Sequence, residues 1–157
     1  MFGMDTMANS VTPFAQSPEV SRVLLMFSNP VLGMLAGLIL TAIIQSSSAS
    51  VGILQALCAS GAVSYATAIP IIMGANVGAC MPALLSGAGG NKGAKRAALI
   101  HLYYNIITTV TFLIVFYAID AFVHFEVLGQ AASAVGVAII HSMFNVAAVI
   151  VLSLIHI

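Results

Sequence analysis

Four consecutive polar residues, Gln45 to Ser48, interrupt a long apolar stretch in which no charge occurs from Val23 to Asn91. Polar groups buried at membrane depth cost free energy unless they are paired. A serine hydroxyl can donate to an oxyanion or offer its oxygen to a cation. The pattern therefore predicts a site for a small polar solute or an ion. Its residues are Gln45, Ser46, Ser47 and Ser48, and Thr41 and Ser50 are secondary candidates.

A second polar interruption lies downstream, where Asn76 stands in the sequence Gly74-Ala-Asn-Val-Gly78. Pro70 precedes this segment and Pro82 follows it. Two glycines between two prolines make a poor continuous helix. We therefore expect a broken helix over 64–86 that is unwound near Asn76, with Gly74 and Gly78 as secondary site candidates.

The composition is that of a membrane protein. Of the 157 residues, 61% are hydrophobic and only 5% are charged, whereas about a quarter of a soluble domain is charged. The charges cancel, so nothing suggests a nucleic-acid partner. Cys58 and Cys80 lie in apolar segments and are expected to be small buried hydrophobes, because two isolated cysteines form no metal-ligand set.

Gln45 to Ser48, called the tip below, lie between two short apolar arms. The first arm, 31–44, has about 14 residues and the second, 49–59, about 11, whereas a bilayer crossing needs roughly 20. Two short arms around a polar tip indicate a re-entrant helical hairpin over 31–60. The alternative is one continuous helix whose serines bond back to carbonyls. In either case Gly33 and Gly37 have a spacing that lets helices approach closely.

The rest of the chain adds two expected spans, 97–119 and 127–151, and completes an all-α membrane protein. Residues 1–28 are expected to hold the end of a preceding helix and a short interfacial helix that begins at Pro18. The main membrane unit is then 29–151. Residues 152–157, Leu-Ser-Leu-Ile-His-Ile, match the in-frame translation of a common sequencing-transposon end, so we expect an adapter artefact there and a chain that is a fragment.

Each of the last two spans carries histidine and asparagine one turn apart: His101 with Asn105, and His141 with Asn145. One interpretation is a proton or ion relay, which makes His101 and Asn105 secondary site candidates. The other is a pair of polar clamps that bond neighbouring helices, and this is the interpretation we favour.

The only basic cluster, formed by Lys92, Lys95 and Arg96, predicts the orientation. The positive-inside rule places loop 87–96 in the cytoplasm. The hairpin would then open to the exterior, with its tip buried in the membrane.

A helix that begins at a buried tip presents free N–H groups and a positive dipole to an anion. The C-terminal end of the other arm offers carbonyl oxygens to a hard cation such as sodium. Since no lysine or arginine is close in sequence, a bound anion would depend on neutral donors and a co-bound cation.

These motifs resemble the type II sodium/phosphate cotransporter family and its bacterial relatives. The resemblance rests on Thr41-Ala-Ile-Ile-Gln-Ser-Ser-Ser-Ala, then Gly74-Ala-Asn-Val-Gly78, then the segment from Lys95 to Asn105. It is strong over about 29–105. One departure is that the family usually has threonine after the glycine break, where this chain has Ala79 and Cys80.

The resemblance implies a transporter with no enzymatic activity and no cofactor, with sodium as the coupling ion. It implies a cytoplasmic-membrane protein of two inverted repeats, of which this chain is the second and the first is missing. Gln45 to Ser48 would contact phosphate and sodium, Asn76 would face them, and sodium would lie at Ser47, Ser48 and Asn76. The absent threonine hydroxyl would remove one sodium ligand and so change the sodium stoichiometry.

The sequence allows two functions other than transport. An intramembrane serine hydrolase could pair Ser48 with His101, but the sequence has no Gly-x-Ser-x-Gly context. An ion-channel-like subunit could use the polar re-entrant loop as a filter. A channel needs several copies around a pore, whereas a transporter needs a second hairpin in the same polypeptide.

Overall fold

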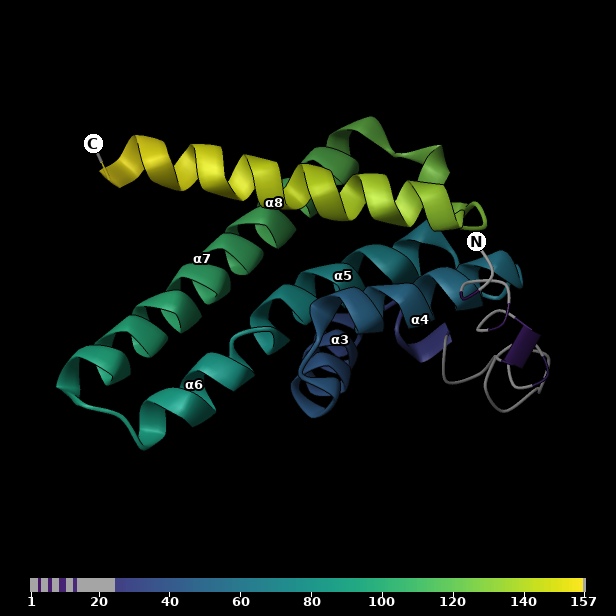
Figure 1. Cartoon of the computed structure of the whole chain (residues 1–157). Helices are drawn as coiled ribbons and strands as arrows, with labels where there is room; N and C mark the ends of the chain where they lie inside the picture. The colour runs from purple at the N-terminus through teal and green to yellow at the C-terminus, as the bar shows by residue number, and fades with distance from the viewer. Residues whose placement is uncertain (1–2, 4–5, 7–8, 11–12, 14–24, 157) are drawn as a thin grey trace.

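The computed structural model describes residues 3, 6, 9, 10, 13 and 25–156, and every named element in this part of the chain is helical (Figure 1). The interfacial helix expected from Pro18 falls mostly on residues outside the described ranges. The elements are α3 (Pro30–Ile44), α4 (Ser47–Ala59), α5 (Tyr65–Gly78), α6 (Met81–Ala88), α7 (Lys92–Val123), the 3-10 helix η1 (Glu126–Gly129) and α8 (Ala134–His156).

Three stretches of the described chain are long and apolar enough to cross a membrane: Tyr65–Ala88, Lys92–Val123 and Ala134–Val151. The helices α3 and α4 are also apolar but shorter. The outward surfaces of α7 and α8 carry many exposed large apolar side chains, among them Ile114 and Met143, as lipid-facing helices do. The predicted all-helical fold, with three stretches able to span a membrane, is confirmed.

The chain breaks between α3 and α4, as the polar tip predicted. Asn29 starts α3 by accepting from the N–H of Val31, and Gln45 ends it in the left-handed conformation, at φ 58°, with its N–H on the Thr41 carbonyl at 2.7 Å. Ser46 then caps α4 by accepting from the N–H of Ala49. The alternative of one unbroken helix is therefore wrong.

The helices α3 and α5 lie against each other through glycines of both helices. A Cβ at Gly37 would collide with the Ile71 carbonyl, and one at Gly74 with the Met34 carbonyl. A Cβ at Gly78 would lie 2.6 Å from the Leu38 carbonyl oxygen. These contacts confirm the close approach expected from the glycine spacing on α3.

This packing corrects the position of the predicted unwinding. Gly74, Asn76 and Gly78 all lie within the continuous helix α5, because the two glycines provide room for α3 and do not loosen the backbone. The interruption falls one turn later, between Gly78 and Met81. Pro82 explains it, since proline has no N–H for the carbonyl four residues earlier and its ring clashes with that carbonyl.

The last span also begins later than the sequence predicted, at Ala134 and not at 127. The intervening residues form η1 and a short connection. Backbone hydrogen bonds join this connection to the residues at the start of α5. The N–H of Ala132 donates to the Val63 carbonyl at 2.8 Å, and the N–H of Tyr65 donates to the Gln130 carbonyl at 3.1 Å. These bonds fix the start of α8 beside the start of α5.

The core lies where α4, α5 and α8 meet. Its largest fully buried side chains include Ile72, Val63 and Val137, which belong to one apolar cluster with Leu54. A second cluster joins α5 to α8 through Met73 and Phe144, and Phe144 meets the Phe112 ring of α7 edge-on with centroids 4.9 Å apart. The second arm of the hairpin is thus part of the core.

Replacing Gly37 with alanine should lower the melting temperature of the chain in detergent, because the new Cβ meets a backbone carbonyl that cannot move alone. Overpacking of this kind costs on the order of 1–3 kcal/mol. The matched control is Gly89→Ala, where an added Cβ meets nothing within 4 Å. Equal melting temperatures for the two variants would contradict the α3–α5 contact.

Candidate functional site

The tip is a two-residue break between α3 and α4, and the Ser46 and Ser48 hydroxyls have hydrogen-bond partners there. The Ser46 hydroxyl accepts from the Ala49 N–H at 3.3 Å and lies 3.2 Å from the Ser48 hydroxyl. Gln45 and Ser48 are exposed, whereas Ser46 and Ser47 are half-buried. The structure therefore brings the four predicted tip residues together on one short turn.

The helix ends give the tip opposite polarities on its two sides. The last turn of α3 directs carbonyl oxygens toward the break, and the first turn of α4 directs N–H groups toward it. A helix C-terminus carries roughly half a negative charge and an N-terminus roughly half a positive charge. The break can thus offer oxygens to a cation and donors to an anion at adjacent positions.

Thr41 and Ser50 lie one turn below the tip, where α3, α4 and α5 meet. Ser50 is 3% exposed, and its hydroxyl donates to the Ser46 carbonyl at 3.1 Å. Thr41 is fully buried, and its Oγ1 is the one buried side-chain oxygen or nitrogen without a hydrogen-bond partner among the described residues.

Asn76 is 6% exposed, and its amide donates to the Ile72 carbonyl of its own helix at 3.2 Å. It lies two residues from Gly74 and from Gly78, which is about 160–200° around a helix of 3.6 residues per turn. Because those glycines face α3, Asn76 is on the far side of α5 from that contact. No hydrogen bond joins it to the tip serines in residues 25–156, so the shared site with Ser46 to Ser48 stays a prediction.

The histidine and asparagine pairs bond within their own helices. The Asn105 amide donates to the His101 carbonyl at 3.0 Å, and the Asn145 amide donates to the His141 carbonyl at 2.7 Å. These bonds do not test whether the pairs also clamp neighbouring helices, so the clamp stays a prediction. The contact between helices at this level comes from the buried Cys80, whose thiol donates to the His101 carbonyl at 3.6 Å. Sequence reasoning missed it because a lone cysteine gives no such signal.

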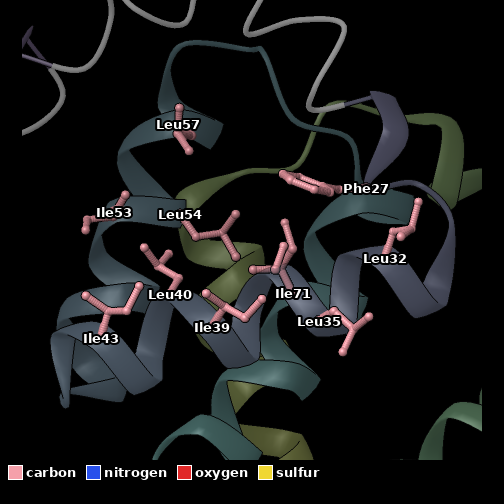
Figure 2. A pocket seen from close by; sticks show the side chains of 11 residues that line it. Phe27, Leu32, Leu35, Ile39, Leu40, Ile43, Ile53, Leu54, Leu57 and Ile71 are labelled. Atoms are coloured by element: carbon pink, nitrogen blue, oxygen red, sulfur yellow. The ribbon is translucent and has the colours of Figure 1, made fainter.

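A groove of about 600 Å³ opens between the two arms of the hairpin, and Figure 2 shows its side chains. It has only apolar side chains, so it offers no donor to an anion and no oxygen to a cation. The sequence did not predict it. It is lined by Phe27, Leu32, Leu35, Ala36, Ile39, Leu40, Ile43, Ile53, Leu54, Leu57 and Ile71.

Comparison with known proteins agrees with the motifs. The profile of the Na+/Pi-cotransporter family matches residues 1–155. The sodium-dependent phosphate transport protein 2A of Rattus norvegicus is 36% identical over 92 residues, which are 55% of this chain and 14% of that protein. No solved structure matches the chain significantly.

Bacterial relatives match as well. YqeW of Bacillus subtilis is 35% identical over 74 residues, 47% of this chain and 24% of that protein. YjbB of Salmonella typhimurium, whose name assigns it to inorganic phosphate export, is 28% identical over 114 residues, 72% of this chain and 21% of that protein. The chain thus spans a quarter or less of each of these relatives. The match over nearly its whole length identifies the chain as a member of the Na+/Pi-cotransporter family, a family of transporters and not of enzymes.

Proposed function

We propose that this chain is one half of a transporter that carries inorganic phosphate across the cytoplasmic membrane together with sodium. The observation that carries the proposal is the broken tip at Gln45 and Ser46, which presents helix ends and hydroxyls within a chain of the Na+/Pi-cotransporter family. The rat relative is named as a sodium-dependent phosphate transport protein, which supports the same substrate here.

The charge balance supports coupling to sodium. Phosphate is singly or doubly negative near neutral pH, and an isolated anion in a low-dielectric medium is prohibitively unstable. The tip supplies neutral hydroxyls and N–H groups, and no lysine or arginine occurs from Val23 to Asn91. A co-bound sodium ion must therefore offset part of the phosphate charge. We place it at Ser47, Ser48 and Asn76, which requires Asn76 to turn toward the tip.

The lengths of the arms support a re-entrant hairpin. The 15 residues of α3 rise about 22 Å and the 13 residues of α4 about 20 Å, less than the hydrocarbon core of about 30 Å. In this proposal both arms enter from the exterior and the tip stops within the membrane. The interruption before Met81 is the second break at that depth.

The residues after that break bear on the sodium stoichiometry. Family members usually have a threonine where this chain has Ala79 and Cys80. The Cys80 side chain is fully buried and bonded to the α7 backbone, which leaves it as a contact between helices and not a cation ligand. We therefore propose that this half supplies fewer sodium ligands than a half that has the threonine.

One half is not sufficient for transport in this proposal. The relatives are several times longer than their matched parts, and a second inverted repeat with its own Gln-Ser-Ser-Ser hairpin would complete the site. The channel-like alternative needs copies of one hairpin around a pore and no second hairpin in the polypeptide. Reading the complete gene distinguishes the two.

Phosphate uptake by the complete protein in vesicles should require sodium and should be negligible when choline replaces it. Ser47→Ala and Gln45→Ala should lower uptake on the order of tenfold, the loss expected for one hydrogen bond to a charged ligand. The matched control is Ser60→Ala, at the opposite end of α4, where the hydroxyl bonds its own helix. This variant should transport normally. Sodium-independent flux in the unmodified protein would remove the basis of the proposal.

Cysteine labelling should place loop 87–96 in the cytoplasm. The two native cysteines are buried and react poorly, so new cysteines can be introduced at the exposed Gly93 and Gly129. A membrane-impermeant maleimide should label Gly129→Cys on intact cells and Gly93→Cys only after permeabilisation. The reverse pattern would contradict the orientation.

A further inference from the structure

The second arm of the hairpin is tied to α8 by one polar side chain. The Gln55 amide lies in the third turn of α4, and its Nε2 donates to the Ala134 carbonyl at the start of α8 at 3.2 Å. Figure 1 shows α4 beside the first turns of α8. In the part of the chain that the structure describes, no other side-chain hydrogen bond joins α4 to another helix.

The carbonyl that accepts this bond belongs to a well-anchored part of the fold. Just before Ala134, the connection to α8 is bonded to the chain before α5, because the Ala132 N–H donates to the Val63 carbonyl at 2.8 Å. One turn into α8, Val137 is fully buried in the core. Gln55 therefore joins α4 to a segment that other contacts hold on both sides.

The side of α4 that faces α3 has no such brace. The groove of about 600 Å³ separates the two arms there, and Ile53 and Leu57 of α4 line it (Figure 2). Apolar packing in the core is non-directional. A hydrogen bond, in contrast, needs a donor within about 3.2 Å of its acceptor and a nearly linear geometry. The Gln55 bond therefore opposes a rotation or a slide of α4 that apolar contacts alone would allow.

The orientation of α4 sets the direction of the tip serines. Ser47 and Ser48 form the first turn of α4, roughly 10–12 Å along the helix axis from Gln55. Ser48 comes seven residues before Gln55, so with about 3.6 residues per turn the two side chains leave the helix within about 20° of each other. A rotation of α4 that turns Gln55 away from Ala134 therefore turns Ser48 by the same angle.

We propose that Gln55 is a positioning residue of the transport site, whose bond to Ala134 holds α4 so that Ser47 and Ser48 face the solute. The inference rests on the proposed transport function, although Gln55 itself contacts neither phosphate nor sodium in it. Without the bond, the arrangement that binds the solute is populated only part of the time. The apparent affinity for phosphate then falls by that fraction, whereas saturating phosphate restores the arrangement and with it the maximal rate.

The first experiment compares transport constants in vesicles that contain the complete protein. Gln55→Met keeps the length of the side chain and removes its amide. It should raise the phosphate KM at saturating sodium on the order of fivefold, the factor that one ordinary hydrogen bond represents, with the maximal rate per folded protein unchanged. The matched control is Thr109→Val, which removes the buried side-chain bond from α7 to the Met73 carbonyl of α5. It should lower the melting temperature and leave the KM unchanged.

The second experiment reports the position of the tip without transport. Nitroxide labels on Ser48→Cys and Gly129→Cys of the purified complete protein give one distance by double electron–electron resonance. Both positions are exposed, whereas the two native cysteines are buried. The distribution of this distance should broaden in Gln55→Met and stay narrow in Thr109→Val.

The inference requires both changes, so an unchanged KM or an unchanged distance distribution in Gln55→Met overturns it. Gln55→Leu, which also removes the amide, decides the matter where Gln55→Met does not fold. Absence of sodium-dependent phosphate uptake by the unmodified protein refutes the proposed function instead. The distance distribution alone then shows whether Gln55 holds the tip in place.

Discussion

The constraint on which this structure depends is that backbone N–H and carbonyl groups inside a membrane need partners. Helix α3 ends after 15 residues, within the expected depth of the bilayer, and α4 begins two residues later. The left-handed Gln45 returns its N–H to Thr41, and the Ser46 hydroxyl takes up the Ala49 N–H. The remaining groups at the two helix ends stay available. The proposed site for charged solutes uses the same geometry that lets the chain turn there.

The two arms of the hairpin have different neighbours. The first arm is held by α5 through backbone-to-backbone contact at glycines, and the second is held by apolar side chains in the core with α5 and α8. Between them lies the apolar groove of Figure 2. The groove between the arms therefore has an apolar lining, and Gln45 to Ser48, Thr41 and Ser50 lie at its tip end.

The polar tip could be predicted from the sequence because an uncharged apolar stretch gives Gln45 to Ser48 no other role. Other features depend on contacts that the sequence does not record. The glycines at 74 and 78 looked like a loosened helix, since their partner α3 lies far away in sequence. The break lies next to Pro82, which acts on the helix locally. Asn105 and Asn145 bond their own helices, a choice that the spacing alone leaves open.

The close glycine contact between α3 and α5 also has a genetic consequence. At Gly37 and Gly74 the nearest atoms to an added Cβ belong to the backbone of the opposite helix. No substitution on that helix can shorten a backbone carbonyl, whereas a clash between two side chains can be relieved by trimming either one. Defects at these two positions should therefore lack local second-site suppressors. Selection should therefore keep each glycine independently of the other. The main chain of the opposite helix requires it, whatever side chains that helix carries.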